Sequence, residues 1–160
     1  KIQEVLEVQE ALPRRMQLVK LNGIKIIDDS YNACPISVKE ALNCLNKISG
    51  NRKIAVLGDM LELGTHEKKS HEDIGVWLYE NDVDIVILYG DRMNFASEKL
   101  RQLKFTGELV YTKDFAVAKH KLINYIQSDD VILIKGSNKM GMSNFIGAIR
   151  DIMINKTSER

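Results

Sequence analysis

Residues able to do chemistry gather at four places where an apolar run of the sequence ends. These are residues 28–32 (DDSYN), 58–62 (GDMLE), 90–91 (GD) and 135–138 (KGSN). Carboxylate, hydroxyl and amide groups can bind ligand hydroxyls or a cation, and a lysine can bind an anion. If the apolar runs are parallel strands, their carboxyl ends lie at one edge of a sheet. We therefore expect these distant residues to converge on one ligand site.

The first of these places is an elbow in the stretch from Gly23 to Leu45, where a buried strand is followed by Pro35 and an amphipathic helix. Adjacent strand residues point to opposite faces, so Asp28 and Asp29 cannot both be buried against the same layer. One could cap backbone N–H groups while the other faces a ligand hydroxyl, a cation or water. Alternatively, both are turn and N-cap residues, a common role of aspartate.

The sequence lacks a self-contained phosphate-binding motif. The sequence has no G-x-G-x-x-G after its first strand and no G-x-x-x-x-G-K-[ST] anywhere, which excludes a dinucleotide fingerprint and a self-contained P-loop. Lys135-Gly136-Ser137 resembles the tail of a P-loop without its upstream glycine. A lysine before a helix can still bind an anion. The alternative, which the sequence supports equally well, is a solvated lysine in an ordinary turn.

Metal ligands are not indicated by the spacing of histidine and acidic residues. His66 and His71 have no cysteine or third histidine at ligand spacing, so hydrogen bonding at the start of a helix is the favoured role. Asp59 with Glu62 could hold a cation, although an aspartate before a helix more often caps it. We expect no metal site, and no Ser-His-Asp or Cys-His arrangement is suggested.

Composition indicates one globular domain over residues 1–160, since 44% of the residues are hydrophobic. The net charge of +1, with both signs interspersed, gives no sign of a nucleic-acid-binding face. Cys34 and Cys44 have no metal-ligand spacing and are expected to be reduced thiols of a cytosolic protein. No apolar run approaches 18 residues, so no membrane span is predicted.

The pattern of apolar residues predicts the elements that position these loops. Asn22-Gly23 between two apolar runs is typical of a tight hairpin turn. Nearly continuous apolar strands separated by helices indicate a parallel sheet covered on both faces. The fold class is therefore α/β, a Rossmann-like doubly wound sheet, mostly parallel with an antiparallel edge strand from the hairpin. Strands are expected at 16–21, 24–28, 53–57, 83–89, 108–111 and 131–134.

Six helices are expected around this sheet. A first helix covers 1–11 and ends at Pro13, and because the chain starts inside it without an initiator Met, we expect a piece of a longer polypeptide. The helix after Pro35 should bury Val38, Ala41, Leu42 and Leu45, and Gly50 follows its end, consistent with a C-terminal stop. Another begins near His66 or Ser70, one covers 93–100, and a further one covers 114–126. A final helix should bury Met142, Phe145, Ile146 and Ile149.

Read in order, several motifs resemble one family. They are Arg15-Met16 before the hairpin, DDSYNACP at 28–35, AVLGDMLELG at 55–64, His71 with Gly75, and KGSN at 135–138. Together they are similar to the C-terminal domain of the Mur ligases, and within that family to the MurF type, from about Ala11 to Ile154.

The resemblance implies a three-domain bacterial cytoplasmic enzyme of peptidoglycan synthesis. Such an enzyme joins D-alanyl-D-alanine to UDP-N-acetylmuramoyl-tripeptide through an acyl phosphate, with ATP hydrolysed to ADP and phosphate. ATP and Mg²⁺ would be held mostly by a central domain, which explains the missing P-loop. The expected partners are both substrates and the N-terminal and central domains of the same polypeptide. We expect a monomer, and we expect this chain to be inactive alone.

The resemblance also assigns roles to single residues. Arg15 matches an arginine near the ATP phosphates, where two guanidinium donors can neutralise phosphoryl charge. Asp29 matches the acid that accepts from the ribose hydroxyls, and Tyr31 and Asn32 lie where nucleotide or substrate is contacted. The dipeptide carboxylate would be bound by two residues at a helix start, Ser137 and Asn138.

Two positions depart from the family pattern. The usual Gly-Arg is Arg14-Arg15, which leaves open which arginine faces the nucleotide, and Arg15 is preferred on its register with Met16. Cys34 replaces the second Asn of Asn-Ala-Asn-Pro, which favours a backbone role there. A sister Mur ligase, folylpolyglutamate synthetase and a non-catalytic binding module for a nucleotide or peptide are the alternative functions.

Overall fold

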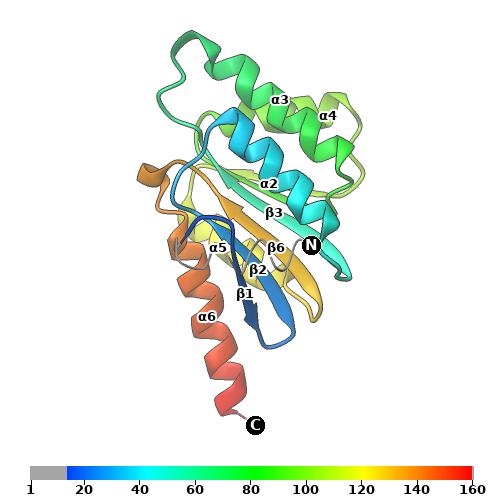
Figure 1. Ribbon diagram of the computed structural model, residues 1–160, viewed down its shortest axis with the longest axis vertical. Helices are drawn as coiled ribbons and strands as arrows, with labels where there is room; N and C mark the ends of the chain where they lie inside the picture. Colours follow the sequence, from blue (N-terminus) through cyan, green and yellow to red (C-terminus); the bar gives the residue numbers. More distant parts are fainter. Residues whose placement is uncertain (1–13, 160) are drawn as a thin grey trace.

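The computed structural model describes residues 14–159, and strands alternate with helices along most of this range (Figure 1). The helix expected at 1–11 and its stop at Pro13 lie outside the described residues.

The described chain opens with the predicted hairpin. Strands β1 (Gln17–Leu21) and β2 (Ile24–Asp29) pair antiparallel, with Leu21 opposite Ile24. The turn residues Asn22 and Gly23 have φ angles of 48° and 83°, and a two-residue type I′ turn needs positive φ at both positions. The Asn-Gly signal is therefore confirmed, and β2 continues one residue further than expected, to Asp29.

Within residues 14–159 the sheet has six strands in the order β1-β2-β6-β3-β4-β5, and all neighbours except β1 and β2 are parallel. The predicted fold class is confirmed. Strand β6 lies between β2 and β3, which brings the last strand of the chain beside the first parallel one. The remaining strands are β3 (Arg52–Gly58), β4 (Ile85–Tyr89), β5 (Glu108–Thr112) and β6 (Asp130–Lys135).

Two helix layers cover the sheet. In Figure 1, α6 runs towards the C-terminus, away from α2, α3 and α4. Alternate strand residues serve the two layers, as Leu57 packs with the first layer and Val56 with the second. The first layer is α2 (Pro35–Lys47), α3 (Glu67–Glu80) and α4 (Met93–Gln102), and the second is α5 (Phe115–Tyr125) and α6 (Ser143–Ser158). Short 3-10 turns lie at Gly64–His66 and Asn138–Met140.

Helix α2 has the predicted buried face and ends before Gly50. Its buried residues are spaced as one stripe of a helix requires. The helix ends at Lys47, with Ile48 as an extended C-cap, so Gly50 follows the end as expected but is not the capping residue. Gly50 instead lies against Val131, where an added Cβ would come within 2.3 Å of a methyl carbon. The buried residues of α2 are Val38, Ala41, Leu42 and Leu45.

The strand ends that carry the polar loops meet at one edge of the sheet. Asp29 is the register partner of Lys135, and Lys135 is also paired with Leu57 of β3. Gly58 is paired in turn with Tyr89 of β4. The predicted convergence of the four loops on one edge is confirmed. Among residues 14–159, no helix combines the length and the apolar character needed to cross a membrane.

Candidate functional site

A buried ion pair joins the ends of β2 and β6. The ammonium of Lys135 donates to Oδ2 of Asp29 at 2.7 Å and to the carbonyl oxygen of Asn32 at 2.9 Å. Only 2% of Lys135 is exposed. The sequence leaves an anion-binding and a solvated lysine equally open. The lysine is not solvated, and two of its three ammonium donors are used within the elbow, so binding of a ligand anion stays a prediction.

The two adjacent aspartates have different partners. Asp28 accepts hydrogen bonds at Oδ1 from the backbone N–H and the hydroxyl of Ser30, at 3.2 and 2.6 Å. Asp28 is therefore a turn residue. Asp29 accepts from Lys135 and, at Oδ1, from the backbone N–H of Met16 at 3.1 Å. A carboxylate has about four acceptor sites, so a further hydrogen bond from a ribose hydroxyl stays a prediction for Asp29.

Arg15 lies on the aromatic ring of Tyr31. Its guanidinium carbon is 4.0 Å from the ring centroid, and that of Arg14 is 5.3 Å away, both within cation–π range. The backbone N–H of Tyr31 donates to the carbonyl of Arg14 at 2.9 Å. Arg14 and Met16, on either side of Arg15, have φ angles of 65° and 47°. The arginine is thus presented at a sharply bent segment beside the elbow.

Four of the predicted site residues are therefore brought together. Arg15 stacks on Tyr31, while Asp29 and the carbonyl of Asn32 share the Lys135 ammonium. Tyr31 and Asn32 are exposed at the rim, and Asp29 is buried beneath them. An exposed cation and aromatic ring above a buried carboxylate can bind an anionic ligand that also carries an aromatic or hydroxyl group.

Ser137 connects two of the converging loops. Its backbone N–H donates to the carbonyl of Asp59 at 3.0 Å, and its hydroxyl accepts from the backbone N–H of Leu61 at 2.8 Å. A hydroxyl that accepts one hydrogen bond can still donate its proton. Asn138 is exposed and begins the short turn after the strand. The role of both residues in binding a carboxylate stays a prediction.

Asp59 caps a helix, although not the helix that follows it. Its Oδ1 accepts from the backbone N–H of Met93 at the start of α4, at 3.0 Å, and its Oδ2 lies 3.4 Å from the guanidinium of Arg92. Arg92 also pairs with Glu67, and that hydrogen bond raises the pKa of Arg92. Glu62 is exposed, and within the described part of the chain no three His, Cys, Asp or Glu side chains could hold a metal ion.

His71 holds the loop after β3 as a neutral imidazole. Its Nε2 accepts from the backbone N–H of Met60 at 3.1 Å, and its Nδ1 lies 2.6 Å from the carbonyl of Glu67. Only the tautomer with its proton on Nδ1 satisfies both contacts. Burial lowers the pKa of His71. Hydrogen bonding near the helix start is confirmed for His71 and wrong for His66, whose side chain makes no capping hydrogen bond.

Gly90 was singled out with Asp91 as one of the converging loops, but Arg92, the next residue, was missed. Its signal in the sequence is its place directly after the Gly90-Asp91 pair that follows β4. Gly90 has a φ of 120°, and an added Cβ would lie 2.5 Å from the carboxyl carbon of Asp59. The glycine therefore makes room for the capping aspartate.

Cys34 is the exposed N-cap of α2. Its backbone N–H donates to the hydroxyl of Ser37 at 3.0 Å, in keeping with the backbone role expected there. Hydrogen bonding from Ser37 lowers the pKa of the Cys34 thiol. Cys34 and Cys44 are both free thiols, as expected.

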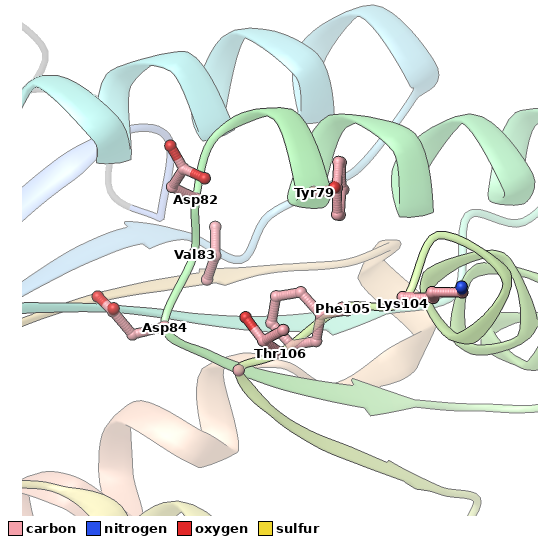
Figure 2. A pocket seen from close by; sticks show the side chains of 8 residues that line it. Tyr79, Asp82, Val83, Asp84, Lys104, Phe105 and Thr106 are labelled. Carbon is pink, nitrogen blue, oxygen red and sulfur yellow. The ribbon is translucent and has the colours of Figure 1, made fainter.

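A separate pocket lies at the opposite edge of the sheet, before the amino ends of β4 and β5 (Figure 2). It has a volume of about 430 Å³ and contains none of the predicted site residues. Figure 2 shows Tyr79 projecting from α3 and Phe105 from the loop before β5. The other lining residues are Asp82, Val83, Asp84, Lys104, Thr106 and Gly107.

Comparison with known proteins decides the family. The sequence model described as "Mur ligase, glutamate ligase domain" matches residues 14–138. The chain belongs to the Mur ligase family. This match covers every predicted site residue, from Arg15 to Asn138, and the resemblance inferred from the motifs is confirmed.

This Mur ligase domain is similar to several larger proteins. It is 32% identical, over 82% of the chain and 29% of the relative, to the UDP-N-acetylmuramoyl-tripeptide--D-alanyl-D-alanine ligase of Bacillus subtilis. A crystal structure of MurF from Acinetobacter baumannii matches at a TM-score of 0.73 and 30% identity, over 87% of this chain and 30% of that one.

A likeness of fold alone extends to MurF from Thermotoga maritima in complex with ADP. The TM-score is 0.76 at 23% identity, and the match covers 91% of this chain and 32% of that one. The Mur ligase domain thus spans less than a third of each of these relatives.

Proposed function

We propose that this chain is the C-terminal domain of a three-domain, ATP-dependent ligase that adds D-alanyl-D-alanine to UDP-N-acetylmuramoyl-tripeptide. The observation that carries the proposal is the meeting of the family's motifs at one sheet edge, with Arg15 stacked on Tyr31 above Asp29. Similarity to relatives named for this reaction supports it. The protein would be a monomer of the bacterial cytoplasm that serves peptidoglycan synthesis.

The reaction has two steps. The terminal phosphoryl group of ATP moves to a carboxylate oxygen of the tripeptide, which forms an acyl phosphate and releases ADP. The amine of D-alanyl-D-alanine then attacks the carbonyl carbon, and the tetrahedral intermediate collapses as phosphate leaves with its oxygen. Both steps develop negative charge on phosphate oxygens, which suits a fixed guanidinium.

Arg15 is the residue of this chain that we assign to that charge. It is exposed, and its segment is bonded to the elbow through Met16 and Tyr31, so it can meet a ligand without rearranging the backbone. Asp29 would accept from the ribose, and Tyr31 and Asn32 would contact the nucleotide or substrate. Such groups favour the transition state most when they are positioned in advance.

The dipeptide would be bound at the end of β6. Ser137 and Asn138 lie at one sheet edge with the elbow, so that a carboxylate there could be held while the amine faces the acyl phosphate. Domain closure would bring this edge over the nucleotide and exclude water, which protects a reactive intermediate. The residues that hold Mg²⁺, which neutralises phosphate charge when bound, are assigned to the central domain.

The proposal is tested by ADP release from the full-length protein. With UDP-N-acetylmuramoyl-tripeptide present, addition of D-alanyl-D-alanine is expected to start turnover, and this chain alone is expected to be inactive. Turnover that does not depend on the dipeptide would contradict the assignment and favour a sister ligase. Nucleotide binding without turnover would favour a binding module.

A further inference from the structure

We propose that Lys135 is a positioning residue that acts through Asp29 to hold Arg15 against Tyr31 before any ligand binds. The catalytic consequence rests on the proposed function, because it requires Arg15 to act on phosphate. The geometric part does not depend on that function.

Two hydrogen bonds attach the arginine segment to the elbow. The backbone N–H of Met16 donates to Oδ1 of Asp29 at 3.1 Å, and the carbonyl of Arg14 accepts from the backbone N–H of Tyr31 at 2.9 Å. These bonds lie immediately before and after Arg15. The direction in which Arg15 leaves the backbone is therefore set by residues of the elbow.

Lys135 holds both sides of that elbow from beneath. Its ammonium binds Oδ2 of Asp29 at 2.7 Å and the carbonyl of Asn32 at 2.9 Å, so it joins the residues that flank Ser30 and Tyr31. The same carboxylate thus receives Lys135 at one oxygen and Met16 at the other. The buried ammonium of Lys135 therefore fixes Asp29, which accepts from the backbone N–H of Met16. It also fixes the backbone next to Tyr31, the residue whose ring Arg15 contacts.

The arginine segment needs these contacts to keep its shape. Arg14 and Met16 have φ angles of 65° and 47°, which are unfavourable for residues that carry a Cβ. Without Lys135, Asp29 would be a buried carboxylate without its ion-pair partner, and it would turn towards water. That movement weakens the bond from Met16, and the bent segment is then free to relax.

Lys135 is placed to affect the reaction through other residues and not by contacting a ligand itself. Only 2% of its surface is exposed, while Arg15 and Tyr31 lie at the rim. Loss of Lys135 is therefore expected to change how well Arg15 is positioned rather than to remove a ligand contact. A small misplacement of a catalytic group can reduce a rate by about 100-fold.

The first test compares two variants of the full-length protein that each remove the partner of a buried carboxylate. Lys135→Met removes the ammonium from Asp29. The control is Arg52→Met, because Arg52 binds the buried Asp130 at 2.9 and 2.8 Å at the opposite edge of the sheet. We expect Lys135→Met to lower kcat about 10- to 100-fold with KM for the dipeptide unchanged. Arg52→Met should stay within about twofold of the parent.

A double-mutant cycle separates positioning from general damage. In an Arg15→Ala background, Lys135→Met is expected to change kcat by less than about twofold, because the residue through which it acts is already gone. If the loss were equally large with and without Arg15, the proposal would be overturned.

A measurement without turnover tests the geometry directly. The Nε–H resonance of Arg15, assigned by its loss in Arg15→Lys, is expected to be shifted by the Tyr31 ring in the parent and in Arg52→Met. In Lys135→Met it should move to the position of an unstacked arginine. An unchanged shift in Lys135→Met would overturn the inference. An inactive parent with the expected shifts would contradict the proposed function alone.

A folding check precedes these comparisons. If circular dichroism shows that Lys135→Met is unfolded, Lys135→Gln takes its place, because an amide keeps neutral donors near Asp29. The same outcomes then apply: a displaced Arg15 resonance and non-additivity with Arg15→Ala support the proposal, and parental values of both overturn it.

Discussion

The ammonium of Lys135 lies 2.7 Å from Oδ2 of Asp29, although the two residues are 106 positions apart in the sequence. The Lys135 side chain is 2% exposed, and the Asp29 side chain is 10% exposed. Leaving one member of a buried ion pair without its partner costs about 3–5 kcal/mol. We therefore expect Lys135→Met to lower the free energy of unfolding by about that amount in urea denaturation. Arg52→Met should lower it by a similar amount, because it leaves the fully buried carboxylate of Asp130 without its partner.

Two helical glycines should respond in opposite directions to alanine. At Gly75 of α3, an added Cβ would lie 2.8 Å from the carbonyl oxygen of Ala96 and from Cβ of Lys99, so Gly75→Ala should destabilise by about 1–3 kcal/mol. At Gly147 of α6 no neighbouring atom of residues 14–159 lies within 4 Å of an added Cβ, and Gly147→Ala should stabilise by about 0.5–1 kcal/mol. Thermal denaturation measures both. A stabilising Gly75→Ala would contradict the close packing of α3 on α4.

His71 should make stability depend on pH. Its folded-state pKa is lowered by burial, so the unfolded chain binds the proton more readily, and stability rises with pH. The contribution is complete above the unfolded pKa of about 6.5 and is lost as pH falls below it, by at most ~1.4 kcal/mol per pH unit. Asp59, Glu67 and Arg92 are the charged groups that act on it.

The measurement is the difference in unfolding free energy between the parent and His71→Gln. This difference is expected to be constant above about pH 7 and to shrink towards pH 5. A difference that grew on acidification would show that the imidazolium, not the imidazole, fits the site.

Arg15→Ala in the full-length protein should impair turnover far more than stability. The side chain is exposed, so the free energy of unfolding should change by less than about 0.5 kcal/mol. Loss of a donor to developing charge lowers kcat by about 100- to 1,000-fold. The control is Arg14→Ala, which removes the more distant guanidinium on Tyr31. If Arg14→Ala caused the larger loss, the catalytic role would pass to Arg14.

Local patterns were enough to predict much of the fold. Asn22-Gly23 predicts the hairpin because only residues tolerant of positive φ make this turn. The continuous apolar runs predict parallel strands buried on both faces, and their parallel arrangement predicts that the polar loops meet. Gly50 follows the end of α2 as expected, but the capping residue is Ile48, and the small size of Gly50 serves its contact with Val131.

The pairing within the site depends on topology and could not be predicted from neighbours in the sequence. Lys135 meets Asp29 because β6 is inserted between β2 and β3. Asp59 caps a helix whose first residue, Met93, lies 34 positions further along the chain. Neither relationship has a local pattern, so both aspartates could be placed at the site but not given their partners.

The central claim is that this domain serves a ligase specific for D-alanyl-D-alanine. The most direct test is mass spectrometry of the product made by the full-length protein from ATP and UDP-N-acetylmuramoyl-tripeptide, with D-alanyl-D-alanine competing against glutamate, diaminopimelate and single alanine. We expect one product, the tripeptide substrate extended by the intact dipeptide. A product extended by a single amino acid, with the dipeptide left unused, would contradict the claim.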